Sequence, residues 1–547
     1  MTAILFLETM IVGVIWTISY MIRGRLGRTP ATLRVWIRRM SRHAVISCAS
    51  VGAIATGLAL TMVSRKIPVP EVHDEFAYLL AADTYAAGRL TNPTPPHPEH
   101  FETFHVLVRP TYASKFPPGL GLVLMAGKLI GGHPVYGSVI LAGLAIASTC
   151  WMLRSWLPRD WAFTLSLWLS CNLVLVARWG TSYWGGNLSL LGSNLMWGAI
   201  PRFVRRPSVW QGLIAGMGIA IMSLSRPYEG MVATILGMFL LWGLIRRTPQ
   251  SWWPVVCRGF IPAALPLAAA LLFHARVYHA VTGTWWKLPY TTWQQQYAPH
   301  VPLFVWQPTA PPPLRNLPVD LQLFWDQESQ RAQRQGSWHG YLEIKLPEVA
   351  FIILTLFDLF AFPLLLGWAT AFSLPSWRLK LGVCSLAGIS VLGISWLHAH
   401  YLASFLGVIL AFVGLGLRTC YTARHFNGPF FVSLLLLAQL GLTGYKLRDY
   451  TQRPPTWADL RQSLEARLRS GSTKHLIFVS RLDARNLHEG WIHNTADWKT
   501  APVLWVRDLG AQQNALLARE FPERRVWWLD LSQQHLLLRP YSFASSP

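Results

Sequence analysis

The sequence is short of charge, and of acidic residues in particular. Only 13% of its 547 residues are charged, and 25 Asp and Glu residues stand against 48 Lys and Arg residues. Hydrophobic residues make up 52%, Trp occurs 28 times, and the mean hydropathy is +0.31. This composition is typical of an integral membrane protein rather than a soluble one, so the lipid bilayer is the first expected partner.

The formal net charge of +23 could suggest a nucleic-acid partner. Nucleic-acid binding needs the basic residues to gather on one face or tail, whereas here they lie in short loops between apolar runs. No nucleic-acid partner is therefore expected, and we interpret the basic loops as topology signals.

Cysteine is also scarce. The six cysteines fall in or beside apolar runs and form no Cys-x-x-Cys pair. A disulfide framework or a cysteine-based zinc site is therefore not expected. The first apolar run also lacks a preceding positive charge, which argues against a cleavable signal peptide.

Twelve apolar runs are predicted to cross the membrane, several of them shorter than the roughly 20 residues that a spanning helix needs. The predicted fold is an all-α polytopic membrane protein. The runs are 3–22, 45–64, 135–156, 161–178, 187–200, 209–224, 230–245, 259–279, 349–372, 381–396, 401–417 and 429–446.

The loop 23–44 holds seven arginines, and the positive-inside rule places it in the cytoplasm. Alternation returns the later basic clusters to the same side. The short run 119–132 contains Lys128 and would reverse that pattern if it crossed, so a helix lying at the outer surface is expected there. Outer loops are then predicted at 65–134 and 280–348.

One acidic residue interrupts the apolar runs near the expected midplane. Asp358 lies in "LTLFDLFAFPLLLG" and could be a structural partner within the bundle or a substrate contact. Otherwise the polar and aromatic clusters fall on the outer face, whereas a transporter more often has polar residues near the midplane.

Beyond the multi-spanning domain at 1–446 the chain becomes polar. Strand patterns at 475–480, 501–506 and 524–531 alternate with helical patterns. We expect a small extracytoplasmic α/β domain over 447–547, an appendage that shapes access for an acceptor.

The first outer loop opens with "HDEF" at 73–76 and later carries "SKFPPG" at 114–119. Asp74 and Glu75 could simply favour the start of a helix, because its dipole attracts acidic residues. The alternative is chemical, since Lys115 offers an ammonium on the same loop. A base and a phosphate-binding cation suit group transfer from a lipid phosphate.

The order of these features resembles the C-type (GT-C) membrane glycosyltransferases, including protein O-mannosyltransferases and lipid A aminoarabinose transferases. An apolar run precedes Asp-Glu with a following Tyr, and Lys-x-Pro-Pro precedes a short amphipathic helix. The resemblance is clearest over 45–200. "SYWGG", "SRPYEG" and "WIHNTADW" also resemble an uncharacterised bacterial subgroup of such proteins.

The resemblance implies an inverting transferase of the bacterial inner membrane with its site on the periplasmic or extracellular side. Its partners would be a polyprenyl-phosphate sugar donor and an envelope acceptor. Asp74 matches the catalytic Asp, Lys115 matches the phosphate-contacting Lys, and Glu75 would orient an acceptor or a metal. The chain departs from some relatives at Phe116, which separates Lys115 from the prolines.

Further residues carry alternatives that the sequence leaves open. Arg226 could contact the donor phosphate, with Glu229 nearby, or could snorkel as a pair with Glu229. His400 and Tyr401 stand at a helix start that would suit a phosphate or ordinary capping. The remaining candidates for sugar, prenyl or acceptor contacts are Tyr78, Trp179, Tyr183 and Trp184, of which the last three could equally be an interfacial belt.

A metal could be held by His97, His100, Glu102 and His105, but exposed loop histidines are usually solvated, so no cofactor is assigned beyond a possible divalent metal. The leading function is a polyprenyl-phosphate-sugar-dependent hexosyl- or pentosyltransferase. The alternatives are a lipid or polysaccharide transporter or flippase, and a non-catalytic assembly protein.

Overall fold

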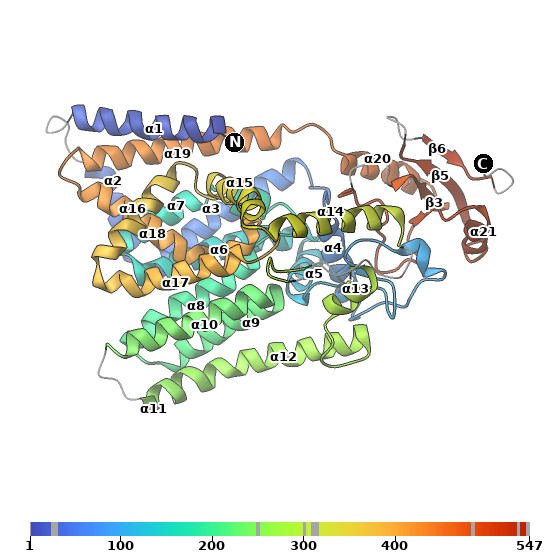
Figure 1. Ribbon diagram of the computed structural model, residues 1–547, viewed down its shortest axis with the longest axis horizontal. Coiled ribbons are helices and arrows are strands. Elements are labelled where there is room, and N and C mark those ends of the chain that lie inside the picture. The colour runs from blue at the N-terminus through green and yellow to red at the C-terminus, as the bar shows by residue number, and fades with distance from the viewer. Residues whose placement is uncertain are drawn as a thin grey trace.

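A computed structural model describes residues 2–22, 31–247, 252–298, 302–307, 317–482, 487–532 and 537–542. Part of the arginine-rich loop, 23–30, lies outside the described residues. Long helices dominate the chain, and a mixed sheet stands at one end of the long axis (Figure 1).

The apolar part of the chain forms a bundle of helices, with two short π-helical turns and two 3₁₀ turns. These elements are α1 (Thr2–Met21), α2 (Ala31–Arg42), α3 (Ala44–Arg65), α6 (Val135–Trp156), α7 (Arg159–Leu169), η2 (Leu173–Arg178), α8 (Asn187–Arg205), α9 (Val209–Ser225), α10 (Pro227–Ile245), α11 (Trp252–Val255), η3 (Val256–Phe260), α12 (Ile261–Thr282), α15 (Trp338–Leu356), η4 (Asp358–Phe360), α16 (Ala361–Ser373), α17 (Pro375–Leu392), η5 (Ala399–Leu402), α18 (Ala403–Thr422) and α19 (Gly428–Thr451).

The expected count of about twelve spans is not supported. Six described helices are long and apolar enough to cross a membrane, or seven if α15 and the η4–α16 segment, bent by 110° at their junction, form one span. Each of the twelve predicted runs does coincide with helix. By length and composition the structure therefore supports a membrane protein with fewer full spans.

Length, breaks and polarity explain the difference. Helix α9 has only 17 residues, and the run 161–178 is split between α7 and the π-helical turn η2. Helix α8 carries Asn, Ser and Arg side chains, and α17 carries Arg378 and Lys380 near its start. Hydropathy detects such segments but does not show where a helix breaks.

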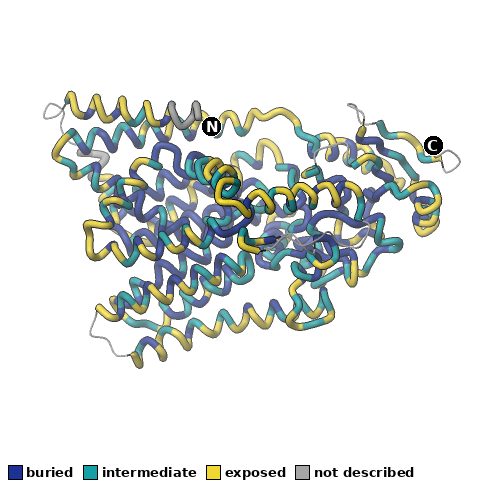
Figure 2. Tube along the Cα trace, viewed as in Figure 1, coloured by how far each residue is buried: buried dark blue, intermediate teal, exposed yellow. Residues whose placement is uncertain are grey.

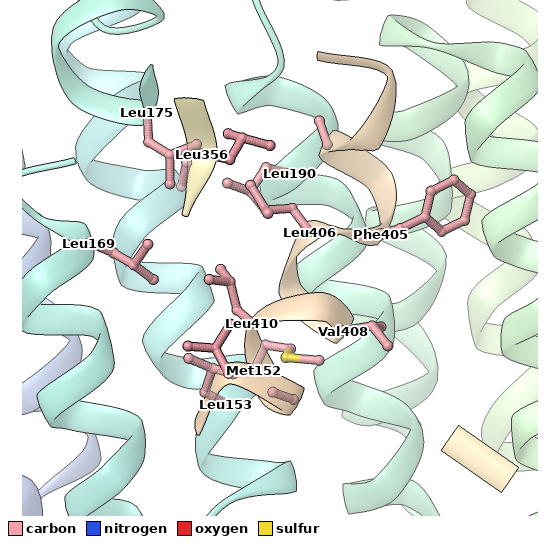
Figure 3. Packing of buried hydrophobic residues seen from close by; sticks show 14 of the residues in the cluster. Met152, Leu153, Leu169, Leu175, Leu190, Leu356, Phe405, Leu406, Val408 and Leu410 are labelled. Atoms are coloured by element: carbon pink, nitrogen blue, oxygen red, sulfur yellow. The ribbon is translucent and has the colours of Figure 1, made fainter. Parts of the chain in front are cut away.

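The bundle core is apolar and closely packed. Helices α6, α8 and α18 bring together Leu153, Leu190 and Leu410 among the side chains drawn in Figure 3. Close backbone approach occurs where Gly52 of α3 faces Gly143 of α6, because a Cβ on Gly52 would lie 2.9 Å from the Gly143 carbonyl oxygen. Small residues at such crossings are typical of helix packing in membranes.

The outermost helices expose much of their apolar surface. Figure 2 shows exposed faces along α1, α12 and α19. Exposed tryptophans cluster near helix ends at both borders, as expected of interfacial anchors. Those near the arginine-rich ends are Trp36, Trp210, Trp252 and Trp253, and those near the opposite ends are Trp285, Trp286, Trp306 and Trp338.

Several shorter elements lie between the bundle and the sheet. They are α4 (His73–Ala86), η1 (Pro98–Phe101), β1 (Val106–Leu107), β2 (Ala113–Ser114), α5 (Pro118–Gly131), α13 (Pro289–Tyr297) and α14 (Val319–Gln335). Helix α5, expected at the outer surface, is too short to span and packs beside α4 through a 2.7 Å ion pair between Lys128 and Asp83. These elements hold the candidate site.

The C-terminal sheet has the strand order β4-β3-β5-β6. Strand β3 pairs in parallel with β4 and β5, and β6 runs antiparallel to β5. The predicted strands are confirmed and β6 was missed, because it is short and ends in proline. The elements are α20 (Trp457–Arg469), β3 (Lys474–Ser480), β4 (Val503–Arg507), α21 (Ala511–Arg519), β5 (Arg524–Asp530) and β6 (Leu537–Pro540).

The sheet shares one hydrophobic core with the segments that were predicted to be outer loops. Phe101 and Phe104 of the first outer loop belong to the same buried cluster as Phe478 and Leu504 of the sheet. A fully buried Arg507 on β4 also forms a bidentate ion pair with Asp320 of α14. Residues 447–547 therefore brace the outer loops directly.

Candidate active site

Asp74 and Glu75 lie in the first turn of α4, where the helix dipole favours acidic side chains. Glu75 is buried, and its oxygens accept backbone N–H bonds from Glu71 at 2.6 Å and Val72 at 3.3 Å. A third bond comes from the N–H of Tyr183 at 3.0 Å. Glu75 thus caps its own helix and ties it to the loop before α8.

Asp74 faces a different environment. Its side chain remains 31% exposed, and its Oδ1 lies 3.1 Å from Nε2 of His105. The same His105 nitrogen lies 3.0 Å from Nδ1 of His73. Asp74 is therefore the carboxylate of the pair that a substrate can approach.

Both histidines are neutral near pH 7. Burial lowers the pKa of His73 to about 3, with His488 and Lys115 adding to the effect. Burial also lowers the pKa of His105 well below its usual value. The pKa of Asp74 is raised by burial, although Lys115 and Arg226 both oppose that rise.

Lys115 follows strand β2 and is almost fully buried. Its Nζ lies 3.7 Å from the ring centroid of Trp293 and 4.6 Å from that of Tyr290, both on α13. Among the described residues no carboxylate oxygen lies within 4.0 Å of this ammonium. Burial lowers the pKa of Lys115 to about 7, against Asp74 and Glu328, which raise it.

Arg226 stands at the junction of α9 and α10. Its Nη1 lies 3.3 Å from Oε1 of Glu229, and its guanidinium lies 5.0 Å from the ring centroid of Tyr401. An Arg226–Glu229 ion pair was one of the two alternatives that the sequence left open. The positive charge of Arg226, like that of Lys115, lowers the pKa of Asp74. Lys115, Arg226 and Asp74 therefore come from three separate parts of the chain to one region.

The other predicted contact residues form two groups: those beside Lys115 or Tyr401, and those that pack within the protein. Tyr78 stacks on Phe116 with 4.7 Å between ring centroids, beside Lys115. His400 is buried against the rings of Tyr401 and Trp184, at 4.6 and 4.8 Å.

In the second group, Tyr183 is committed to the protein itself. It is buried, and its hydroxyl donates to the carbonyl of Pro68 at 2.7 Å. Trp179 is likewise buried, against Gly185 and Gly186. These two aromatic residues shape the loop before α8.

Sequence reasoning missed several neighbours of Lys115 and Asp74. Trp293 and Tyr290 form the aromatic surround of the ammonium, and the buried Glu328 of α14 accepts a hydrogen bond from Nε1 of Trp396. Glu328 also raises the pKa of Lys115 through its charge. Nothing in the local sequence of α13 links its aromatic residues to Lys115.

The histidine loop does not form the metal site considered from sequence. Nδ1 of His100 lies 2.7 Å from the carbonyl oxygen of Arg507, and the backbone carbonyl of Glu102 accepts from Nε of Arg507 at 2.6 Å. His97 lines an open cleft with residues of α21. Only His105 of that set reaches Asp74.

His73, Asp74 and His105 could instead hold a metal ion, since one ligand atom from each lies within 4.8 Å of the others. Separations near 3 Å suit neighbouring ligands of a divalent ion, which binds nitrogen at about 2.0–2.1 Å. The outer nitrogens, Nε2 of His73 and Nδ1 of His105, are buried without a hydrogen-bond partner. Metal-bound histidines usually donate from that second nitrogen, so only the inner ligands fit a metal site.

Asp358 proves to be a structural partner. It begins η4 with φ +48°, and its carboxylate pairs with Lys446 of α19. Its second oxygen accepts from Nε2 of Gln439 at 3.1 Å. The same Gln439 accepts the N–H of Leu359, so this charge is fully used in holding a helix break against α19.

No family model and no curated protein matches the chain. Among solved structures, the fold is similar to the oligosaccharyltransferase of Archaeoglobus fulgidus in its apo form, with a TM-score of 0.50, 13% identity, and coverage of 88% of this chain and 69% of that one. A structure of that protein tethered to an acceptor peptide gives 0.49, 12%, 88% and 68%. A third, with Zn and sulfate, gives 0.46, 13%, 88% and 67%.

At this identity the likeness establishes the fold alone. The chain is similar in fold to that oligosaccharyltransferase, which is compatible with the GT-C-like fold expected from "HDEF" and "SKFPPG". The particular resemblance to O-mannosyl- and aminoarabinose transferases stays a prediction.

Proposed function

We propose that the chain is a membrane glycosyltransferase that moves a sugar from a polyprenyl-phosphate donor to an envelope acceptor, which would be a lipid, a glycan or a protein. The observation that carries the proposal is the grouping of Asp74 with Lys115 and Arg226. Asp74 lies 3.1 Å from His105, which accepts a backbone hydrogen bond from Lys115, and the positive charges of Lys115 and Arg226 both lower the pKa of Asp74. A GT-C-like fold supports the same chemistry by analogy.

The reaction needs a base and a stabilised leaving group. Asp74 takes the proton of an acceptor hydroxyl or amide while that atom attacks the anomeric carbon. The bond from that carbon to the phosphate oxygen breaks, and the prenyl phosphate leaves with the electron pair. One displacement inverts the anomeric centre. Lys115 and Arg226 meet the charge that grows on the phosphate.

Neighbouring side chains have supporting roles in the proposal. Glu229 and Tyr401 hold the Arg226 guanidinium, and His400 stands behind Tyr401 on the same side. Tyr78 and Trp184 offer rings to the sugar or prenyl chain. Tyr183 and Glu75 act indirectly, because their polar atoms are bonded within the protein.

A divalent metal at His73, Asp74 and His105 would add positive charge near the leaving phosphate. The proposal assigns no step to it, since Lys115 and Arg226 already supply two cations. Chelation followed by metal addition tests this point directly.

The alternative of an envelope lipid or polysaccharide transporter draws on the bent helix pair at Asp358. Broken helices do line transport sites. Here, however, the Asp358 carboxylate is occupied by Lys446 and Gln439. This arrangement favours a structural break over a transport site.

Transfer is tested by incubating purified protein with a panel of radiolabelled prenyl-phosphate sugars and envelope extract. We expect label to move to the extract with the wild type and not with Asp74→Asn of equal folding. Vesicles loaded with labelled lipid provide the transport arm. Flipping that persists in Asp74→Asn, with no transfer in the wild type, would favour the transporter.

The proposed location is a bacterial inner membrane, with the site and residues 447–547 on the outer side. Single cysteines placed at 42 and 97 in a cysteine-free background test the orientation. An impermeant thiol reagent applied to intact cells should reach position 97 and miss position 42. Labelling at 42 would reverse the topology.

A further inference from the structure

His105 contacts both Asp74 and Lys115, the first through its side chain and the second through its backbone. The His105 side chain lies 3.1 Å from Asp74, and its backbone carbonyl accepts the N–H of Lys115 at 3.0 Å. The proposed base and one phosphate-binding cation are therefore linked through a single amino acid.

A small hairpin makes this link stiff. Strands β1 and β2 pair antiparallel, with Val106 opposite Ser114 and Leu107 opposite Ala113. His105 and Lys115 are the next pair in that register, and the hydrogen bond between them continues the ladder. The backbone thus fixes Lys115 relative to His105.

The surroundings fix the His105 ring as well. Its centroid lies 5.2 Å from that of Phe116, 5.4 Å from that of Trp293 and 4.8 Å from that of His73. The residue has φ +64°, a left-handed conformation that is uncommon outside glycine. Such conformations persist where the surrounding structure determines them, and they gather at functional sites.

Hydrogen-bond roles follow from the charge of Asp74. An ionised carboxylate can only accept, so a neutral His105 must carry its proton on Nε2 to bond with it. Nδ1 of His73 then faces that same proton as a second acceptor. The arrangement orients the carboxylate without adding charge next to it.

We propose that His105 is a positioning residue that sets the orientation of Asp74 and its distance from Lys115. This inference rests on the proposed function and deepens it. The hairpin supplies the fixed frame, and the Nε2–H bond attaches the base to that frame. His105 itself neither takes the acceptor proton nor binds the donor phosphate.

The test compares His105→Gln with His105→Leu. Both are equally unsuited to positive φ, but only Gln can donate to Asp74 from a similar distance. We expect kcat to fall by up to about 100-fold in His105→Leu, as for other small misplacements of catalytic groups, with substantial recovery in His105→Gln. Donor affinity should stay near wild type in both, because the backbone bond to Lys115 survives.

His97 supplies the matched control. It belongs to the same loop and also has positive φ, at 44°, but it lines the cleft beside α21. His97→Leu should therefore leave kcat unchanged. Equal loss in His97→Leu and His105→Leu would show that the loop matters only for folding and would overturn the inference.

His105→Gly separates positioning from backbone strain. Glycine adopts φ +64° without strain but lacks both the ring and the Nε2–H donor, so kcat should fall about as far as in His105→Leu. A role in backbone conformation alone would leave kcat near that of the wild type.

Suppose that the wild type transfers sugar, so that the proposed function holds. Two outcomes would then still reject the positioning role of His105. One is normal kcat in well-folded His105→Leu. The other is chelator-sensitive activity restored by a divalent metal in the wild type but not in His105→Gln, which would make His105 a metal ligand. Absence of transfer by the wild type with every donor would instead reject the proposed function.

Discussion

Two Asp–Lys neighbourhoods within the described residues are built in opposite ways. Asp358 pairs directly with Lys446, and Gln439 fills its second oxygen. Lys115 lowers the pKa of Asp74 and Asp74 raises that of Lys115, but the two side chains form no ion pair. One pair is complete, and the other leaves both charges available.

This difference separates a structural pair from the proposed active site. Burying charge is unfavourable unless it is paired and hydrogen-bonded, so a protein that only needs stability completes the pair. Lys115 is instead held by the rings of Trp293 and Tyr290. Aromatic faces attract a cation but leave its N–H groups free for an anion such as phosphate.

The largest expected effect comes from removing the base. Asp74→Asn keeps the shape of the side chain but not its proton affinity, and a general base contributes about 10²- to 10⁴-fold to rate. Turnover in matched, folded preparations should fall by that order, with donor binding spared. Asp358→Asn should lower thermal stability and leave the turnover of the folded fraction nearly normal. Near-normal turnover in Asp74→Asn would remove the proposed base.

The second comparison removes the lysines. A hydrogen bond to a charged group contributes about 1.5–3 kcal/mol, so Lys115→Met should weaken binding of a prenyl phosphate by roughly 10- to 100-fold. Lys446→Met should leave that affinity unchanged and destabilise the fold by roughly 1–3 kcal/mol, because the Asp358 carboxylate loses its partner. Tryptophan fluorescence titration and thermal unfolding measure the two. An unchanged donor affinity in Lys115→Met would contradict its role.

A third prediction concerns pH. The pKa of Lys115 is lowered to about 7, so the ammonium is present below that pH and is lost as pH rises through it. Affinity for prenyl phosphate should therefore fall above pH 7, approaching about tenfold per pH unit and levelling off at the roughly 10- to 100-fold loss expected of Lys115→Met. Arginine stays protonated, so Lys115→Arg should flatten this limb. A wild-type affinity that is flat from pH 6 to 9 would argue against Lys115 as the titrating contact.

Sequence patterns could indicate the candidate site because its central parts are local. "HDEF" and "SKFPPG" each carry their chemistry within a few residues, and the hydropathy pattern put both on one face. The residues that surround Lys115 could not be found in the same way. Trp293 and Glu328 lie far along the chain from Lys115, and only tertiary packing brings α13 and α14 to it.

The fold shows the same limit. The apolar runs located the helices, but the number of spans depends on breaks such as the one at Asp358. There a positive φ ends the helix, and the N–H of Leu359 donates to the side-chain oxygen of Gln439. His105 was singled out for a metal together with His97 and His100. The loop pattern could not indicate that His105 alone turns inward to Asp74.

The smallest effect is expected at Glu75, next in sequence to the proposed base. Its oxygens accept three backbone N–H groups, and burial raises its pKa to about 7, although those bonds lower it. Near neutral pH the side chain is thus partly protonated, and Glu75→Gln removes less charge than a fully ionised group would lose. An amide oxygen still accepts, but the amide nitrogen cannot, so about one hydrogen bond is lost and stability should fall by about 0.5–1.5 kcal/mol. Turnover should change only a few-fold, because the carboxylate facing the substrate is Asp74. Thermal unfolding and transfer rate, measured side by side with Asp74→Asn, check this ordering. A rate loss in Glu75→Gln as large as that in Asp74→Asn, with stability intact, would move the base from Asp74 to Glu75.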